Sequence, residues 1–229
     1  MTQRIGIFGG TFDPVHYGHI ASAKMLVTQL SLDTLYFMPC QQHPFHKHPG
    51  ASPAQRANML ALAVADEAQL QVDERELRRD GMSYTVDSLQ EIRREFGNDA
   101  VIVFILGTDA FASLHQWERW QSILDFANVA VIERAGQLTI AQIIEAELKA
   151  LLAQSVTSVK ASHGELVQLV LEPYIISSTV LRSALAATYQ VDSKVDSQVD
   201  EAQIKVINEF IPASVVQYIE AQQLYQSNH

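Results

Sequence analysis

The sequence predicts an α/β protein built on a Rossmann-like, doubly wound parallel sheet, with a small C-terminal helical portion. Short β-branched or aromatic runs alternate with stretches of helical periodicity, and this alternation indicates βαβ units with right-handed crossovers. The most apolar run, Val101–Leu106, has no polar position, as expected of a strand covered on both faces. A glycine turn at Gly9 and Gly10 ends the first run, at the strand end where ligands of such sheets bind.

Taken in order along the chain, the apolar runs predict strands at residues 4–8, 34–38, 70–72, 101–106, 129–132 and 167–171. Helical periodicity predicts helices at residues 18–30, 53–65, 85–96 and 139–154. A last helix, between Phe210 and Tyr225, is expected to pack its apolar face against the body of the protein.

The chain is predicted to form one domain over residues 1–229, with the parallel-sheet core in 1–175 and C-terminal helices in 176–229. Residues 191–202 repeat with a period of four, as Val-Asp-Ser-Lys, Val-Asp-Ser-Gln and Val-Asp-Glu-Ala. The repeat can form a helix with its valines on one face. Its Asp, Ser and Val content instead favours an extended or mobile surface insertion near residues 190–203.

The net charge and the cysteine content indicate which partners and which cellular compartment to expect. Sixteen basic against 26 acidic residues give a net charge of −10, which argues against a nucleic-acid scaffold and requires a local positive pocket for any anionic substrate. The single cysteine, Cys40, fits a reducing compartment. The chain enters a strand at once, without room for a signal peptide, and no apolar stretch is long enough to span a bilayer. We therefore expect a cytoplasmic protein without membrane partners.

Residues 9–19 read Gly-Gly-Thr-Phe-Asp-Pro-Val-His-Tyr-Gly-His and join the first strand to the first helix. The glycine turn lets backbone approach a ligand closely, from Gly9 through Phe12. His16 and His19 are three residues apart where the helix begins, so both rings can face one spot, which Gly18 leaves open. A polyphosphate suits this arrangement. A partial metal site or ordinary surface histidines are the alternatives.

A second cluster, Ile176-Ser177-Ser178-Thr179-Val180-Leu181-Arg182, lies near the other end of the chain. Its hydroxyls stand where a helix is expected to start, and Arg182 follows one turn later on the same face. Hydroxyls, free backbone N–H groups and a guanidinium form a second anion cradle. The alternative is a plain helix cap with a solvated arginine.

Together the two segments resemble the H-x-G-H and I-S-S-T-x-x-R signatures of the nucleotidyltransferase superfamily. Between them the chain is most similar to bacterial nicotinate-nucleotide adenylyltransferases, from Arg4 to about Tyr225, with matches at residues 73–77, 83–85 and 104–109 and at Trp117. The resemblance implies transfer of AMP from ATP to nicotinate mononucleotide, giving nicotinate adenine dinucleotide and pyrophosphate in NAD biosynthesis. It also implies that His16 and His19 bind the triphosphate. The residues expected at ATP are Gly9, Gly10, Thr11, Phe12, Gly18, Gly107, Asp109, Ile176, Ser177, Ser178, Thr179 and Arg182.

Several residues in the middle of the chain suit the acceptor nucleotide. Trp117 offers a flat face for a nicotinate ring, with Trp120 as the competing tryptophan. Ser83 and Thr85, on either side of Tyr84, are expected to cap a helix whose free N–H groups receive the nicotinate carboxylate. The resemblance implies that backbone amides near Thr85 and Trp117 select the acid over the amide.

The strand end at 107–109 suits the nucleoside. Gly107 has no side chain, so a nucleoside can lie over it, and Asp109 can accept hydrogen bonds from ribose hydroxyls. A turn and a helix cap are the structural alternative.

The loop from Cys40 to His48 carries one thiol and three histidines, but their spacing fits no usual structural zinc pattern. The family resemblance implies that the basic end of this loop meets substrate phosphate, so we expect Lys47 and His46 to contact it. Arg134, just past the fifth strand, is expected to contact phosphate by its position.

The acceptor phosphate is already ionised near neutral pH, so no catalytic base is required. Catalysis is expected from positioning and charge stabilisation, with Mg²⁺ held mainly by phosphate oxygens and water. A transferase for nicotinamide mononucleotide or phosphopantetheine and a non-catalytic nucleotide-binding protein remain the alternatives. The sequence leaves the oligomeric state open, a homo-oligomer included.

Overall fold

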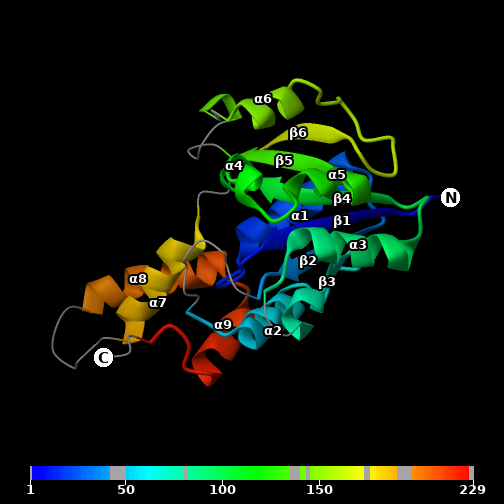
Figure 1. Ribbon diagram of the computed structural model, residues 1–229. Helices are drawn as coiled ribbons and strands as arrows, with labels where there is room; N and C mark the ends of the chain where they lie inside the picture. Colours follow the sequence, from blue (N-terminus) through cyan, green and yellow to red (C-terminus); the bar gives the residue numbers. More distant parts are fainter. Residues whose placement is uncertain are drawn as a thin grey trace.

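A parallel sheet forms the centre of the computed structural model, which describes residues 2–41, 50–79, 82–134, 140–142, 145–172, 176–189 and 197–226. Its strands follow the order β3-β2-β1-β4-β5-β6, and every pairing between neighbours is parallel (Figure 1). The strands are β1 (Arg4–Gly10), β2 (Thr34–Pro39), β3 (Leu70–Val72), β4 (Val101–Gly107), β5 (Asn128–Arg134) and β6 (Leu166–Leu171). The predicted doubly wound α/β fold is confirmed.

Helices cover both faces of this sheet (Figure 1). One hydrophobic core is shared by α1 (Tyr17–Gln29), α2 (Pro53–Ala63), α7 (Ser178–Tyr189), α8 (Ser197–Phe210) and α9 (Ala213–Ala221). The other is shared by α3 (Thr85–Phe96), α4 (Thr108–Ala112), α5 (Ile123–Phe126) and α6 (Ala146–Leu152). Short 3₁₀ turns η1 (Arg75–Arg78), η2 (Leu114–Gln116), η3 (Trp120–Ser122) and η4 (Ile140–Gln142) lie in the connections. Among the described residues no helix is long and apolar enough to cross a membrane.

The strand order places the carboxyl ends of β1 and β4 side by side at the centre of the sheet. The chain runs outward through β2 and β3 on one side and through β5 and β6 on the other, so the order reverses between β1 and β4. In doubly wound sheets, ligands bind in the crevice at such a switch point. The residues predicted as functional lie at or after the carboxyl ends of the six strands of the sheet.

The predicted strands, and the helices at 18–30, 53–65 and 85–96, are confirmed with boundaries shifted by one or two residues at most. Local chemistry explains these helices. Ser52 accepts a hydrogen bond from the Gln55 N–H, the Gln55 side chain returns one to the Ser52 N–H, and Pro53 occupies the first turn of α2.

The helix predicted at residues 139–154 is wrong in extent. Of the residues that the structure describes in this range, Ala146–Leu152 forms an α-helix and Ile140–Gln142 a 3₁₀ turn. The turn is held apart from the helix because the Ile140 N–H donates to the Glu133 carboxylate near the end of β5. The helix predicted between Phe210 and Tyr225 is likewise shorter, since α8 ends at Phe210 and α9 spans Ala213–Ala221.

The repeat at residues 191–202 was expected to be extended or mobile, and the part from Ser197 onward is instead the first turn of α8. The physical reason lies further along the helix. Ile207 is buried in the core shared with α7, so packing holds the amphipathic helix and the repeat extends it toward its N-terminus. The first residues of the repeat lie outside the described ranges.

Candidate active site

The loop between β1 and α1 turns its aromatic side chain inward. Phe12 is buried with a φ of +53°, and its ring covers Gly10 so closely that a Cβ there would approach ring carbons at 2.7–3.0 Å. Position 10 therefore requires glycine unless Phe12 moves. Because the Phe12 side chain is buried against Gly10, it is the backbone of Phe12 that can contact a ligand.

His16 and His19 lie together at the start of α1. Their ring centroids are 3.8 Å apart and the ring planes are inclined by 30°, so the structure brings the two imidazoles to one place, as their spacing predicts. The His16 N–H donates to Nδ1 of His19 at 3.3 Å within a capping box. A ring nitrogen that accepts this bond carries no proton, so Nε2 of His19 carries it and is a hydrogen-bond donor. The edge of Phe12 packs against the His19 ring at 5.1 Å between centroids and fixes its orientation.

The second predicted segment docks onto this same loop. Ser178 Oγ donates to the Pro14 carbonyl at 3.0 Å, and Arg182 Nη1 donates to the Asp13 carbonyl at 2.6 Å. These bonds join residues 164 and 169 positions apart. The two predicted anion-binding segments therefore form one corner of the molecule, at the carboxyl end of β1.

Within the second segment the predicted helix start is confirmed. Ser177 Oγ accepts the Val180 N–H at 3.3 Å at the start of α7. Arg182 Nη2 donates to Thr179 Oγ1 one turn earlier, at 3.3 Å. The side chain of Arg182 is 32% exposed, so its guanidinium remains accessible to an anion despite these bonds.

Sequence reasoning missed Arg56 of α2, which is fully buried beneath the loop. Its guanidinium donates to the carbonyls of Thr11 at 2.8 Å, Cys40 at 2.6 Å and Gln41 at 3.3 Å. Arg56 therefore joins the segments that follow β1 and β2. It also places a positive charge behind the proposed anion site in a chain of net charge −10. No sequence signal marks it, because it stands in an ordinary amphipathic helix.

The start of α3 differs from its prediction. Tyr84, not Ser83 or Thr85, occupies the N-cap position, and its side chain makes no capping hydrogen bond. Ser83 Oγ donates instead to the Glu76 carbonyl at 3.1 Å, so the predicted capping role is wrong. The first-turn N–H groups of α3 are consequently left without a side-chain cap, as an anion-binding helix start requires.

Glu76 lies behind this helix start and is buried. Ser88 Oγ donates to its Oε1 at 2.8 Å. Burial raises the pKa of the Glu76 carboxyl to about 7, although the Ser88 hydrogen bond and the nearby Arg79 oppose the shift. The carboxyl therefore changes its charge close to neutral pH.

Comparison with known proteins shows the family of this chain. Residues 7–184 match the family model described as cytidylyltransferase-like. A protein of Chromobacterium violaceum named "probable nicotinate-nucleotide adenylyltransferase" is 40% identical over 203 residues, covering 87% of this chain and 95% of that protein. The chain belongs to this family. A protein of the same name from Cellvibrio japonicus is 50% identical over 136 residues, 59% of this chain and 64% of the relative.

The fold of the nicotinate-nucleotide adenylyltransferase family is also found among solved structures. Plasmodium falciparum nicotinic acid mononucleotide adenylyltransferase, solved in complex with NaAD, superposes with a TM-score of 0.67 over 97% of both chains. At 18% sequence identity this likeness concerns the fold.

Gly107 and Asp109, predicted at the nucleoside, lie where β4 ends and α4 begins in this adenylyltransferase-family chain. Gly107 is the N-cap of α4, and a Cβ placed on it would meet no atom within 4 Å. The space above Gly107 is open, as the prediction requires, and Asp109 in the first turn of α4 is exposed.

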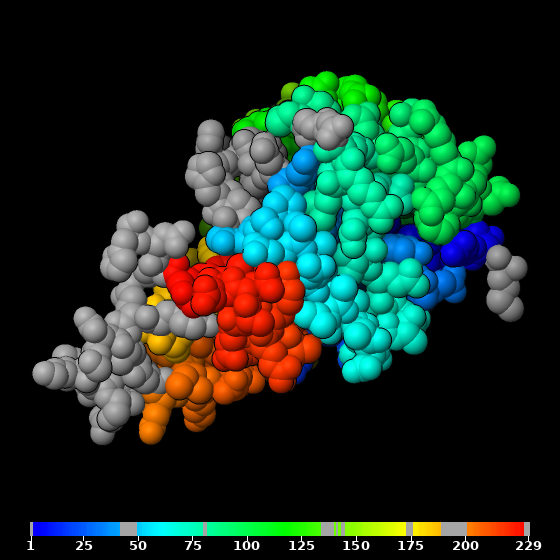
Figure 2. All heavy atoms as spheres, turned by 90° about the horizontal axis from the view of Figure 1, so that it is seen from below, coloured from blue at the N-terminus to red at the C-terminus, as the bar shows by residue number. Residues whose placement is uncertain are grey.

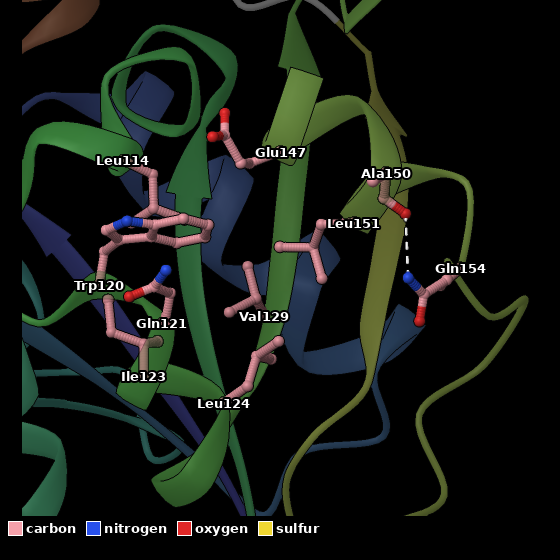
Figure 3. A pocket seen from close by; sticks show the side chains of 10 residues that line it. All are labelled: Leu114, Trp120, Gln121, Ile123, Leu124, Val129, Glu147, Ala150, Leu151 and Gln154. Atoms are coloured by element: carbon pink, nitrogen blue, oxygen red, sulfur yellow. Dashed lines mark hydrogen bonds between the residues drawn. The ribbon is translucent and has the colours of Figure 1, made fainter. Parts of the chain in front are cut away.

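The two tryptophans lie in different surroundings. Trp117 packs edge-on against Phe104 of β4, with ring centroids 6.3 Å apart, and its backbone N–H donates to the Leu114 carbonyl. Trp120 instead lines a pocket of about 360 Å³ with Leu124 and other apolar side chains, between η3, α5 and α6 (Figure 3). None of the predicted site residues lines that pocket, so Trp117 remains the candidate for the nicotinate ring.

Some predicted residues lie outside the described ranges, namely His46 and Lys47. The backbone of Arg134 ends β5, but its side chain is not described. Among the described residues no group of three or more His, Cys, Asp or Glu side chains is placed to hold a metal. Burial raises the pKa of the Cys40 thiol, which donates to Thr11 Oγ1 at 3.8 Å.

Proposed function

We propose that this chain transfers AMP from ATP to nicotinate mononucleotide, forming nicotinate adenine dinucleotide and pyrophosphate. The observation that carries the proposal is the docking of Ser178 and Arg182 onto the loop that presents the stacked histidines. In this proposal the Arg182 guanidinium, the Thr179 hydroxyl and the Nε2–H donor of His19 bind one triphosphate, since charge-assisted donors favour phosphate oxygens. The names of the relatives support the choice of acceptor.

The chemistry follows from these groups. The acceptor phosphate attacks the α-phosphorus of ATP and pyrophosphate leaves, so one P–O bond forms as another breaks. The nucleophile is already ionised, and the chain need only orient it and stabilise the developing charge. Nε2–H of His19 donates to a phosphate oxygen that gains charge in the transition state. Arg182 and the hydroxyl of Thr179 hold the β- and γ-phosphates that depart, while the Ser178 hydroxyl, which donates to the Pro14 carbonyl, holds this segment against the histidine loop.

The start of α3 is proposed to receive the nicotinate carboxylate. Tyr84 leaves the first-turn N–H groups uncapped, and the partial positive charge of a helix N-terminus favours an anion. A carboxylate is stabilised both by hydrogen bonds from these N–H groups and by the partial positive charge. The carboxamide of nicotinamide is neutral, so the partial positive charge does not favour it in the same way. This difference favours the acid as substrate.

Mg²⁺ is proposed to arrive with ATP. The Asp13 carboxylate next to the histidines already accepts bonds from protein donors, including the Gly50 N–H at 2.8 Å. The donor set of the described site therefore fits a metal held by phosphate oxygens and water. Bound there, Mg²⁺ would supply charge neutralisation of the triphosphate.

A pyrophosphate-release assay tests the proposed function. ATP is combined in turn with nicotinate mononucleotide, nicotinamide mononucleotide and phosphopantetheine. Turnover is expected to be fastest with nicotinate mononucleotide. Turnover with phosphopantetheine alone would contradict the acceptor, and ATP binding without product from any acceptor would favour a non-catalytic nucleotide-binding protein.

A further inference from the structure

Tyr225, which follows α9 and belongs to neither motif, reaches the loop that carries the histidines. Its hydroxyl donates to Asp13 Oδ1 at 2.6 Å, across 212 positions of sequence. Burial, and then the negative charge of Asp13, raise the pKa of Tyr225 above its usual range. The hydroxyl therefore stays protonated and remains a donor at neutral pH.

Asp13 is the point at which several segments meet. Its buried carboxylate accepts the Gly50 N–H at 2.8 Å and the Ala51 N–H at 3.2 Å, where the chain returns from the loop after β2. Its backbone carbonyl accepts Arg182 of the second motif. One residue thus connects the β1–α1 loop, the start of the α2 region, α7 and the segment after α9.

The ring of Tyr225 also fits closely over the backbone it anchors. A Cβ on Gly50 would approach two of its ring carbons at 2.8 Å. In Figure 2 the segment around α9, coloured red, lies directly against the segment around α2, coloured cyan. The hydroxyl and the ring therefore act on the same short stretch of chain.

The turn after α9, which places Tyr225 beside Asp13, is stabilised by backbone hydrogen bonds. After α9 the Leu224 N–H donates to the Ile219 carbonyl and the Gln223 N–H to the Glu220 carbonyl, which is the Schellman pattern. Gln223 and Tyr225 have φ values of +51° and +62°, a conformation that side chains larger than Asn or Asp seldom adopt. Leu224 between them is buried. The surroundings thus impose this conformation and direct the hydroxyl toward Asp13.

We propose that Tyr225 is a positioning residue for the reaction: by fixing the Asp13 carboxylate it holds the histidine loop, the Gly50–Ala51 backbone and Arg182 in register around the triphosphate. The proposal rests on the function proposed above. Tyr225 does not touch substrate and acts only through Asp13.

The experiment compares Tyr225→Phe, which keeps the ring and removes the hydroxyl, with Tyr218→Phe. Tyr218 is the matched control, because its hydroxyl accepts a bond from Asn58 Nδ2 at 3.0 Å between α9 and α2 but reaches neither motif. For Tyr225→Phe we expect the KM for ATP to rise about tenfold and exchange of the Gly50 and Ala51 amide protons to accelerate about tenfold. Tyr218→Phe is expected to leave both quantities at wild-type values.

Equal KM values and equal exchange rates in the two variants would overturn the proposal. A double variant supplies a second test: if Tyr225 acts through Asp13, Asp13→Ala with Tyr225→Phe is no worse than Asp13→Ala alone, and multiplied losses would contradict this. If the wild-type protein shows no turnover with nicotinate mononucleotide, the proposed function fails. The amide-exchange comparison then still decides whether Tyr225 holds the loop.

Discussion

The two histidines at the start of α1 differ in burial and therefore in what they can do. His16 is only 3% exposed and forms the N-cap of the helix, whereas His19 is partly exposed. His19 is also the residue whose Nδ1 accepts a backbone N–H, so its ring proton is on Nε2, which can donate to a phosphate oxygen. His16 thus shapes the helix start, and His19 is the better candidate for direct contact with the reacting phosphate.

His19→Ala is expected to lower turnover about a hundredfold or more without unfolding the protein, because one donor to the transition state is worth about 2.7–4 kcal/mol. Steady-state kinetics and thermal unfolding measure the two effects. His163→Ala is the control, since His163 is exposed on a distant loop. A His19→Ala enzyme with nearly full turnover would contradict the role of this imidazole.

Glu76 makes stability depend on pH in a defined window. Burial raises its pKa to about 7 in the folded protein from an ordinary value of 4.5, so between these values the folded state binds more protons than the unfolded chain. Stability is therefore expected to fall as pH rises through this window and to level off above it. The change is at most about 3 kcal/mol.

Glu76→Gln is expected to remove that slope and to be the more stable protein at pH 8. Urea unfolding at several pH values between 5 and 8 measures the slope. Glu74→Gln serves as the control, because Glu74 precedes the same 3₁₀ turn and its side chain is 45% exposed. Parallel curves for wild type and Glu76→Gln would show that the carboxyl is not the titrating group.

At the scale of elements, two helix starts at the same edge of the sheet are treated differently. Ser177 precedes α7, and its side chain caps that helix. Tyr84 precedes α3, and its side chain makes no capping hydrogen bond. An uncapped helix start costs stability, which is tolerable where a ligand completes it. The difference favours α3 as the receiver of the acceptor carboxylate.

Tyr84→Ser is expected to change stability and binding in opposite directions. A serine cap should stabilise the protein by about 1 kcal/mol, because it satisfies a free N–H of α3. By occupying that N–H it should raise the KM for nicotinate mononucleotide about tenfold. Urea unfolding and steady-state kinetics give the two values.

Glu145→Ser is the matched control for Tyr84→Ser, since Glu145 is the N-cap of α6 and likewise makes no capping bond. It should add stability and leave KM unchanged. A Tyr84→Ser variant with unchanged KM would remove the start of α3 from the proposed binding site.

At the scale of the whole molecule, the C-terminal helices are part of the active-site frame. α7, α8 and α9 share a hydrophobic core with α1 and α2. Arg182 of α7 and Tyr225 after α9 connect this C-terminal part to the histidine loop by hydrogen bonds to Asp13. A ligand held between the two motifs therefore contacts groups from both ends of the sequence. Binding of such a ligand should therefore raise the free energy of unfolding of the whole molecule.

ATP at one hundred times its dissociation constant is expected to raise the free energy of unfolding by about 2.7 kcal/mol. At the same ATP concentration Arg182→Met should retain about half of this gain, as a tenfold weaker affinity requires. Arg78→Met, at a position 77% exposed, should retain all of it. Urea unfolding with and without ATP measures these differences, and equal gains for the two variants would place Arg182 outside the triphosphate site.

Patterns of residues close together in the sequence were sufficient to predict the fold and to locate the two motifs. The buried run Val101–Leu106 and the glycine turn at residues 9–10 act through neighbours in sequence, and both lie in the structure where they were predicted. Prediction was wrong where distant packing decides, as in α8, whose Ile207 is buried in the core, and at Ser83, which bonds to the Glu76 carbonyl.

The sequence by itself determined the alternation of strands and helices, the helix starts rich in donors and the spacing of the histidines, because these depend on residues within one or two turns of each other. Only the tertiary structure decided which remote groups meet. Arg56 under the loop, and Tyr225 and Arg182 on Asp13, are hydrogen bonds between segments distant in sequence. Such bonds form only after the sheet and its helices have packed, so no local pattern encodes them.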